Sequence, residues 1–218
     1  MLFLYLQSMY NIPYFKEQDK NLVLEFMRKH CFATLIAVDY SSKAVATHIP
    51  FFIDERDGRV FLSGHFMRNT DHYNAFEKNE HVLAIFNGPQ CHVSARLYSE
   101  QQTASTWNYM TVHAKGILKF MDDAGLINIL KRTTDYFEND PSSPSLFENL
   151  PAAYVASMSK HIVAFEIEVT ELDNVFKLSQ NKDEATYQRI IDHLEKQDYE
   201  SIQIAMEMKK RKNQLFEK

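Results

Sequence analysis

The sequence predicts an α+β protein that is mainly β, built as an antiparallel barrel with helices at its margins. Six or more short apolar segments follow one another with few helices between them, which is typical of a barrel. In segments such as 161–172, apolar and polar residues alternate, as in a strand with one buried face. The chain then ends in two helical segments, near 183–196 and 199–214.

The first half of the chain is predicted to contain two helices among four strands. The helix over 19–30 begins at Asp19, a good N-cap residue, and the helix over 69–79 also opens with capping residues. Asp57-Gly58 predicts a tight turn between two strands. The strands are predicted over 31–38, 44–53, 59–65 and 81–88. Alternation along the second of these strands places His48 and Ile49 on opposite faces.

The second half continues the same pattern. We expect strands over 91–98, 111–121 and 161–172, and a helix over 122–139. The connections over 99–105 and 139–145 are polar or rich in Pro and Ser, and are expected to be loops.

The length of 218 residues suits one large domain with an appendage. We expect a barrel domain over 9–180 and a helical C-terminal appendage over 181–218. The opening run MLFLYLQS lacks the basic start of a signal peptide and is too short to span a membrane. Residues 1–8 are therefore interpreted as a disordered leader or an upstream start-site artefact.

The composition narrows the class of protein. With 45% hydrophobic and 24% charged residues, the chain has the profile of an ordinary globular protein. A net charge of −5 argues against a surface devoted to phosphate backbones, so we expect direct DNA binding to be weak or absent. The two cysteines, Cys31 and Cys91, are too few for a disulfide framework, which favours a reducing, cytoplasmic location and no membrane association.

The sequence lacks the motifs that several kinds of binding and catalytic chemistry require. The five glycines cannot form a phosphate-binding loop, and the nine histidines have no zinc-ligand spacing. No serine lies in the signature of an activated nucleophile. We therefore predict no metal site and assign no catalytic residue.

Two segments carry polar groups that a plain core strand does not need. In 63–71, Gly64 allows close approach of the backbone and Arg68 supplies a forked cation before a helix N-terminus, which suits a phosphate. The alternative is a capped surface helix with a solvated arginine. In 105–116, the only tryptophan, Trp107, precedes Asn108 and His113, which suits a flat ligand with polar edges.

Six short motifs occur together in one order along the chain. They are FATL (32–35), THIPFFI (47–53), SGH (63–65), TWNY (106–109), VHAKG (112–116) and FKLSQN (176–181). This pattern resembles the PaiB family, which comprises FMN-binding negative transcriptional regulators related to the split barrels of the pyridoxamine-phosphate-oxidase type.

The resemblance implies a split β-barrel homodimer that holds FMN between its subunits. The residues that it places along the flavin ring are Thr34, His48, Ile49 and Pro50. Those that it places around the phosphate tail are Gly64, His65, Arg68 and Asn69. Trp107, Asn108 and His113 would lie on the side that faces the partner subunit, and Lys177, Ser179 and Gln180 would close the site.

Three functions remain open from the sequence. The first is an FMN-binding regulator of the PaiB type that senses redox state or a metabolite. The second is an FMN-dependent oxidoreductase or flavin reductase on the same barrel. The third is an interaction protein on this fold that binds no flavin, since a fold does not fix a function.

Overall fold

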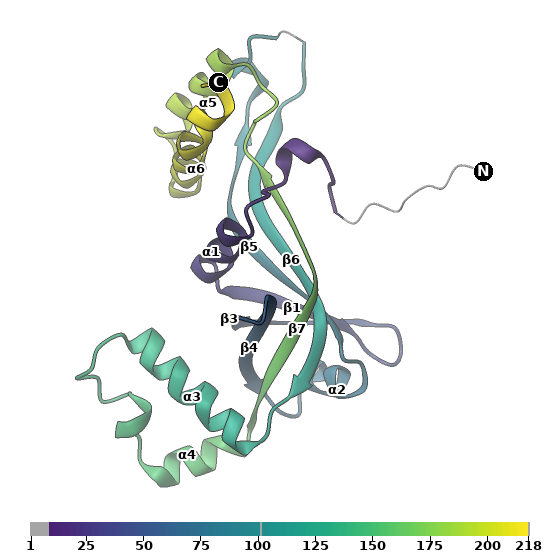
Figure 1. Ribbon diagram of the computed structural model, residues 1–218, viewed down its shortest axis with the longest axis vertical. Coiled ribbons are helices and arrows are strands. Elements are labelled where there is room, and N and C mark those ends of the chain that lie inside the picture. The colour runs from purple at the N-terminus through teal and green to yellow at the C-terminus, as the bar shows by residue number, and fades with distance from the viewer. Residues whose placement is uncertain (1–8, 101, 218) are drawn as a thin grey trace. The chain divides into compact units, whose positions relative to one another are not determined.

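The computed structural model describes residues 9–100 and 102–217, so the predicted leader over 1–8 lies outside the described residues. Within them the chain forms a seven-stranded sheet in the order β2-β1-β5-β6-β7-β4-β3 (Figure 1). The strands are β1 Phe32–Val38, β2 Ala44–Pro50, β3 Phe52–Arg56, β4 Arg59–Met67, β5 His81–Val93, β6 Thr106–Phe120 and β7 Ile162–Lys177. The α-helices are α1 Lys20–Lys29, α2 Asp71–Lys78, α3 Asp123–Glu138, α4 Ala152–Ser159, α5 Glu184–Leu194 and α6 Tyr199–Phe216. Three single 3-10 turns are η1 Pro13–Phe15, η2 Ala95–Leu97 and η3 Phe147–Asn149.

The α+β fold class predicted from the sequence is confirmed. Where their registers are defined, the strand pairs β1–β2, β1–β5, β3–β4 and β4–β7 are all antiparallel. Four helices begin at a side chain that accepts a backbone N–H, which explains why they start where the sequence predicts. These caps are Thr70, Asp122, Asp183 and Asp198. None of the described helices has the length and hydrophobicity needed to cross a membrane.

The predicted single strand over 44–53 is wrong, because the chain changes its pairing partner at Phe51. Pro50 still lies opposite Phe32 of β1, and the backbone N–H of Phe51 donates to the Cys31 carbonyl at 2.9 Å. The next residue, Phe52, already pairs with Ser63 of β4. Since β2 and β3 lie at opposite edges of the strand order, this one-residue switch closes the sheet on itself.

The other differences from the prediction concern the lengths of elements. β5 continues through Gly88-Pro89, where a strand end was predicted, and the predicted strand over 91–98 gives way to η2 after Val93. β6 begins at Thr106 rather than at 111, and β7 extends to Lys177. Long-range pairing between neighbouring strands has therefore overridden the local turn signals. Helix α4 was not predicted at all.

The chain divides into two compact units. The barrel unit comprises residues 27–86 and 113–172, and the terminal unit comprises the described residues of 1–26, 87–112 and 173–218. The predicted division into 9–180 and 181–218 stays a prediction.

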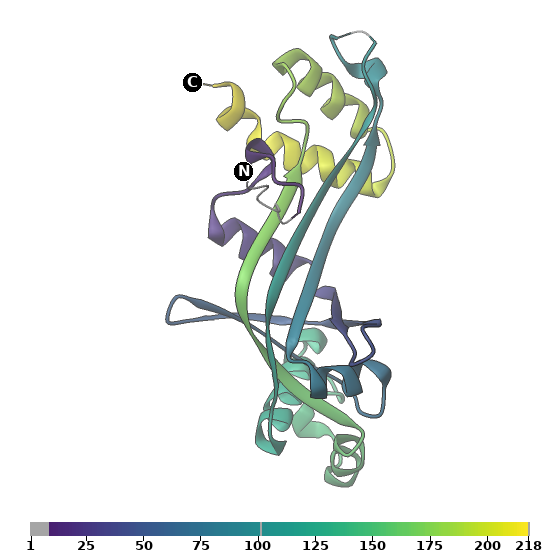
Figure 2. The same ribbon diagram turned by 90° about the vertical axis from the view of Figure 1, so that its right-hand side faces the viewer.

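The barrel unit has an aromatic core. The β1–β2 hairpin runs crosswise to β7 in Figure 2, and the buried residues of this unit include several phenylalanines among aliphatic side chains. The Phe51 ring centroid lies 5.5 Å from that of Phe86 and 5.9 Å from that of Phe165. Phe66 stacks on Phe165 at 5.1 Å. These rings hold β4, β5, β7 and the junction between β2 and β3 around one interior.

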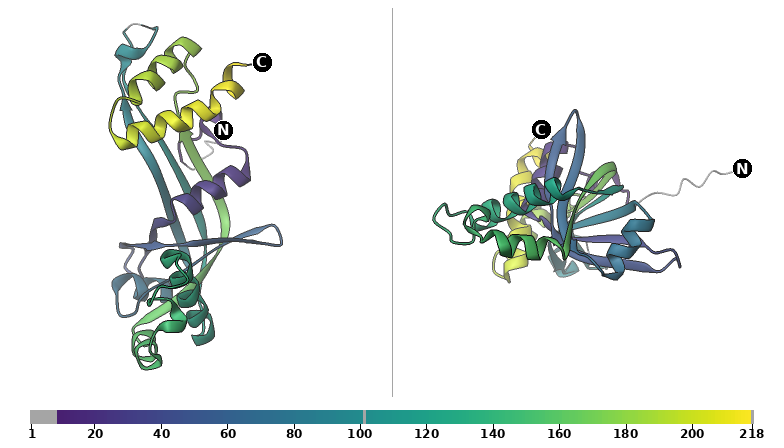
Figure 3. Two further views of the ribbon diagram at one scale, coloured as in Figure 1. Left: turned by 90° about the vertical axis from the view of Figure 1, so that its left-hand side faces the viewer. Right: turned by 90° about the horizontal axis from the view of Figure 1, so that it is seen from below.

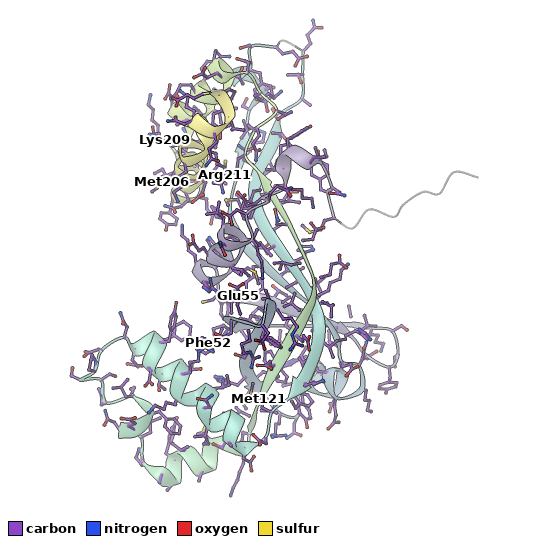
Figure 4. All side chains as sticks on the ribbon, in the orientation of Figure 1. Phe52, Glu55, Met121, Met206, Lys209 and Arg211 are labelled. Atoms are coloured by element: carbon purple, nitrogen blue, oxygen red, sulfur yellow. The ribbon has the colours of Figure 1, made fainter. Side chains whose placement is uncertain are left out.

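Helix α3 is attached to this unit by β3. Both guanidinium Nη atoms of Arg132 donate to the carboxylate of Asp54, at 2.6 and 2.7 Å, and this pairing lowers the pKa of Asp54. The same guanidinium lies 4.1 Å from the ring centroid of Phe52 on β3 (Figure 4). A bidentate ion pair combined with a cation–π contact fixes the orientation of α3 on the barrel.

The terminal unit is organised around α5 and α6, which lie side by side (Figure 3). Tyr187 of α5 is fully buried, and its hydroxyl donates to the Met208 carbonyl of α6 at 3.0 Å. Burial raises the pKa of Tyr187 well above its ordinary value. The phenol therefore stays neutral, and it links the two helices through a buried hydrogen bond.

Candidate functional site

The outer face of the β1–β2 hairpin carries three of the predicted flavin contacts, namely Thr34, His48 and Pro50. Thr34 lies directly opposite His48, and Phe32 lies opposite Pro50, so all four side chains share one face. The rings of Phe32 and His48 stack with centroids 6.5 Å apart, although Phe32 remains 67% exposed. The hairpin thus presents an aromatic, partly polar surface that is not covered within the barrel unit.

Ile49 belongs to the opposite face of the same strand. Its side chain is 6% exposed and lies on the core side, with Ala33 and Leu35 of β1. Only the backbone of Ile49 is therefore available to a ligand on the outer face. The alternation predicted between His48 and Ile49 is present in the structure.

Gly64 brings β4 into contact with the end of β2. A Cβ atom built on Gly64 would lie 3.0 Å from the Pro50 carbonyl oxygen and 3.3 Å from the Phe165 ring. A side chain here would force the strands apart, so glycine is needed for close approach. The segment predicted to bind the phosphate and the segment predicted to bind the ring are therefore neighbours in the barrel unit.

His65 follows Gly64 and is half-buried. Burial lowers the pKa of the His65 imidazole below its ordinary value, so the ring is neutral at pH 7. A neutral imidazole can donate one hydrogen bond and accept another, but it adds no positive charge for a phosphate.

Arg68 is held in place by the start of β7. Its Nε donates to the Ile162 carbonyl at 2.9 Å, and its Nη1 lies 3.5 Å from the Tyr73 hydroxyl. Among the described residues, Nη2 has no hydrogen-bond partner. The side chain is half-buried, so it differs from the freely solvated arginine that was the alternative interpretation.

Asn69 and Thr70 shape the connection between Arg68 and α2. Asn69 has a φ of 59°, in the left-handed region that asparagine tolerates. The Thr70 hydroxyl accepts the Tyr73 N–H at 3.2 Å and caps α2. Asp71 also stands in the first turn of this helix, where its charge disfavours a second anion. Arg68 is therefore the stronger candidate for holding a phosphate.

The predicted residues of the terminal unit divide into exposed and buried ones. Trp107 is 54% exposed and meets His92 edge-on, with ring centroids 6.0 Å apart. Asn108, the next residue on β6, is fully buried. Adjacent strand residues point to opposite faces, so one ligand cannot contact both side chains on the same face.

Asn108, Ser179 and Gln180 are engaged in shaping the end of β7. The Ser179 hydroxyl donates to Asn108 Oδ1 at 3.0 Å, and Ser179 itself has a φ of 62°. The Gln180 side chain bonds the backbone at the end of β7, accepting from Leu178 N–H at 2.7 Å and donating to the Phe176 carbonyl at 2.5 Å. These contacts give all three residues a structural role.

Lys177 and His113 occupy less specific positions. The Lys177 ammonium donates to the Thr106 hydroxyl at 2.6 Å, and burial lowers the pKa of Lys177. His113 is half-buried on β6 in the barrel unit. Their contact with a flavin stays a prediction, as it does for the other residues derived from the resemblance.

Two hollows include residues that the sequence analysis did not single out. In the terminal unit, a cleft of about 680 Å³ is lined by Trp107, His92, Arg96 and His193, among others. In the barrel unit, a cavity of about 1050 Å³ lies between α3 and α4 and includes Arg68. No local motif marks either hollow: the cleft combines residues 90–107 with residues 193–201, and the cavity combines Arg68 with residues 123–160. Among residues 9–100 and 102–217, no three His, Cys, Asp or Glu side chains are arranged to hold a metal ion.

Comparison with known proteins places this geometry among flavin-binding folds. A family model described as "Putative FMN-binding domain" matches residues 9–171. The "Protease synthase and sporulation protein PAI 2" of Bacillus subtilis is 30% identical over 190 residues, which cover 87% of this chain and 91% of that protein.

Two solved structures share the fold at low sequence identity. An FAD and heme binding protein from Mycobacterium smegmatis has a TM-score of 0.58 and 16% identity, over 75% of this chain and 73% of that one. The flavocytochrome Anf3 from Azotobacter vinelandii has a TM-score of 0.52 and 13% identity, over 75% of this chain and 69% of that one. The predicted split barrel is confirmed by these likenesses, which extend to the fold alone.

The contrast between Asn108 and Trp107 gives a direct test of the structural role of Asn108. Asn108→Ala removes the acceptor of the buried Ser179 hydroxyl, and we expect it to lower the free energy of unfolding by about 1–3 kcal/mol. Trp107→Ala, at the exposed neighbouring position, should cost less than about 1 kcal/mol. Urea denaturation of both variants measures the difference, and equal losses would contradict a turn-stabilising role for Asn108.

Proposed function

This chain belongs to the family of the FMN-binding domain, and we propose that it binds FMN as a homodimeric regulator of the PaiB type. The match covers the whole barrel unit, and the related Bacillus subtilis protein aligns over nearly its full length. A flavin ligand follows from the family. That the flavin is FMN, and that particular residues contact it, is our proposal.

The residues of the barrel unit fit such a ligand. The close approach at Gly64 leaves no room for a side chain beside Pro50, and the hairpin face beyond it offers Thr34 and His48. At the end of β4, Arg68 supplies a fixed guanidinium suited to a phosphate. Bound there, FMN would supply redox chemistry of its own, while the protein supplies binding and orientation.

The observation that carries the proposal is the position of Arg68 directly after β4, the strand that contains Gly64. Gly64 and Arg68 are four residues apart, and the backbone of Gly64 lies against the Pro50 carbonyl. A ligand with a flat ring and a charged tail could therefore contact the hairpin face and the guanidinium together. This juxtaposition supports a flavin with a phosphate over one without.

We predict that Arg68→Ala weakens FMN binding but changes riboflavin binding much less. A charge-assisted hydrogen bond contributes about 1.5–3 kcal/mol, so the dissociation constant for FMN should rise about 10- to 100-fold. Riboflavin lacks the phosphate, so its affinity should fall only as far as the substitution disturbs the site in general. Titration of both flavins into each protein, followed by flavin fluorescence, measures the two effects.

Arg59→Ala is the matched control for this experiment. Arg59 is the first residue of β4, at the opposite end from Arg68, and its side chain is 58% exposed and pairs with Glu168 at 2.8 Å. The Arg59→Ala variant should bind FMN and riboflavin as tightly as the wild type does. Equal FMN affinity in wild type and Arg68→Ala would remove Arg68 from the phosphate site, and an equal loss for both flavins would show a structural effect instead.

The proposed homodimer accounts for apolar side chains that the chain leaves uncovered. In the barrel unit, Phe32, Tyr40 and Met67 are each more than half exposed. A second copy that covers the Phe32 face would bury this exposed apolar surface.

We expect light scattering to give the mass of a dimer at micromolar concentration. Phe32→Asp should shift the mass toward a monomer, because it places a charge in the proposed interface. Tyr199→Asp changes an equally exposed aromatic residue of α6 and should leave the mass unchanged. A monomeric wild type would overturn the dimer.

As a regulator, the protein is proposed to act in the cytoplasm without tight DNA binding of its own. Cys31 and Cys91 are both free, which supports a reducing compartment. The net charge of −5 opposes contact with a phosphate backbone. In an electrophoretic shift assay at physiological salt we therefore expect no sequence-specific complex. A persistent shift with sequence preference would contradict this expectation.

A further inference from the structure

The cavity between α3 and α4 has a shape and lining suited to a small ligand. Figure 1 shows the two helices joined by the segment that carries η3. The volume of the cavity, about 1050 Å³, lies at the upper end of the range for pockets that bind drug-sized ligands. Its apolar lining comes from Leu126, Ile127, Phe147, Leu150, Ala152, Val155 and Ala156.

The floor of this cavity is part of the core of the barrel unit. Leu126 is 3% exposed and belongs to a buried cluster with Ile129, Ile162 and Ala164. Met121, at the junction of β6 and α3 (Figure 4), packs against that cluster. The cavity therefore has a fixed, well-packed base.

The opposite wall of the cavity is helix α4, none of whose side chains is buried. Helix α4 has the sequence AAYVASMS, without a charged residue. Tyr154 is 53% exposed and Met158 is 39% exposed. A helix that is apolar on every side is normally covered on at least one of them. A ligand with an apolar body would cover the Val155 and Ala156 side.

The charges around the cavity leave an excess of one positive charge. Lys131 pairs with Glu148, which raises the pKa of Lys131 and lowers that of Glu148, so these two cancel. Arg68, Lys160 and Asp123 remain among the lining residues. No described carboxylate forms an ion pair with Arg68 or Lys160. Two cations against one carboxylate favour a ligand with a single negative charge.

The two cations stand at the same end of the cavity. The backbone N–H of Arg68 donates to the His161 carbonyl at 2.7 Å, which places Arg68 next to the residue that follows Lys160. The Arg68 side chain is then fixed by its Nε bond to the Ile162 carbonyl. A guanidinium held in this way is preorganised for an anionic oxygen.

We propose that the cavity between α3 and α4 binds an amphipathic monoanion, namely a carboxylate with an apolar body. The body lies between Leu126 and Val155, and the carboxylate is met by Arg68 and Lys160 at one end. The proposal does not depend on FMN, because the apolar lining belongs to the α3–α4 segment, and Arg68 is the one lining residue that it shares with the proposed phosphate contact.

Octanoate is a suitable probe, measured by calorimetry on the full-length protein without added flavin. We expect octanoate to bind more tightly than octan-1-ol and octylammonium, which have a similar body and no negative charge. Ala156→Phe fills the cavity and should weaken octanoate by about tenfold or more. Lys160→Ala should weaken octanoate by about tenfold and leave octan-1-ol unchanged.

Ala153→Phe is the matched control, because Ala153 is an exposed residue of α4 that does not line the cavity. It should bind octanoate like the wild type, and circular dichroism should show the same helix content for both phenylalanine variants. Failure of octanoate to bind, equal binding of octan-1-ol, or equal effects of the two phenylalanines would each overturn the proposal. If octanoate does not bind and Ala156→Phe changes the oligomeric mass, a second copy of the chain covers the cavity instead, and the proposal is overturned.

Discussion

The architecture of the barrel unit depends on one local event, the change of partner between Pro50 and Phe52. Up to Phe51 the chain is bonded to β1 and its neighbour Cys31, and from Phe52 it is bonded to β4. A sheet whose terminal strands are joined by a single residue cannot stay open. The close approach of Gly64 to the Pro50 carbonyl is the packing consequence, and a side chain at Gly64 would oppose it. This closure brings the end of the candidate flavin strand, at Pro50, against the strand that leads to Arg68.

Local periodicity predicted most elements, and it failed where pairing or packing acts over a distance. The alternation in 161–172 and the caps at Thr70, Asp183 and Asp198 are local signals, and the structure contains the corresponding elements. The switch at Phe51 leaves no such signal, since the residues before and after it alternate as one strand would. Helix α4 was missed for a related reason, because AAYVASMS has no polar face and therefore no helical period to detect.

The sequence named candidate site residues, but it could not give the contacts that each of them makes in the folded chain. Thr34 and His48 do share an exposed face, as alternation requires. A motif such as KLSQN, however, marks both residues that contact a ligand and residues that hold a turn. The polar groups of Ser179 and Gln180 form hydrogen bonds with Asn108 and with the backbone before the turn. Only the folded chain reveals these bonds. Similarly, the bond from Arg68 to the Ile162 carbonyl joins residues 94 positions apart, so no window of sequence contains it.

Arg68 lines the α3–α4 cavity and is also the residue that we propose for the FMN phosphate. Its Nε is committed to the Ile162 carbonyl and its Nη1 is near Tyr73, which leaves Nη2 as the group best placed to meet an added anion. A guanidinium with only its Nη2 group left for an added anion cannot bind a phosphate and a carboxylate fully at the same time. A carboxylate in the cavity would therefore weaken FMN, and by thermodynamic linkage FMN would weaken the carboxylate by the same factor. Such a coupling needs no large movement of the barrel, because both ligands would act on one side chain at the end of β4.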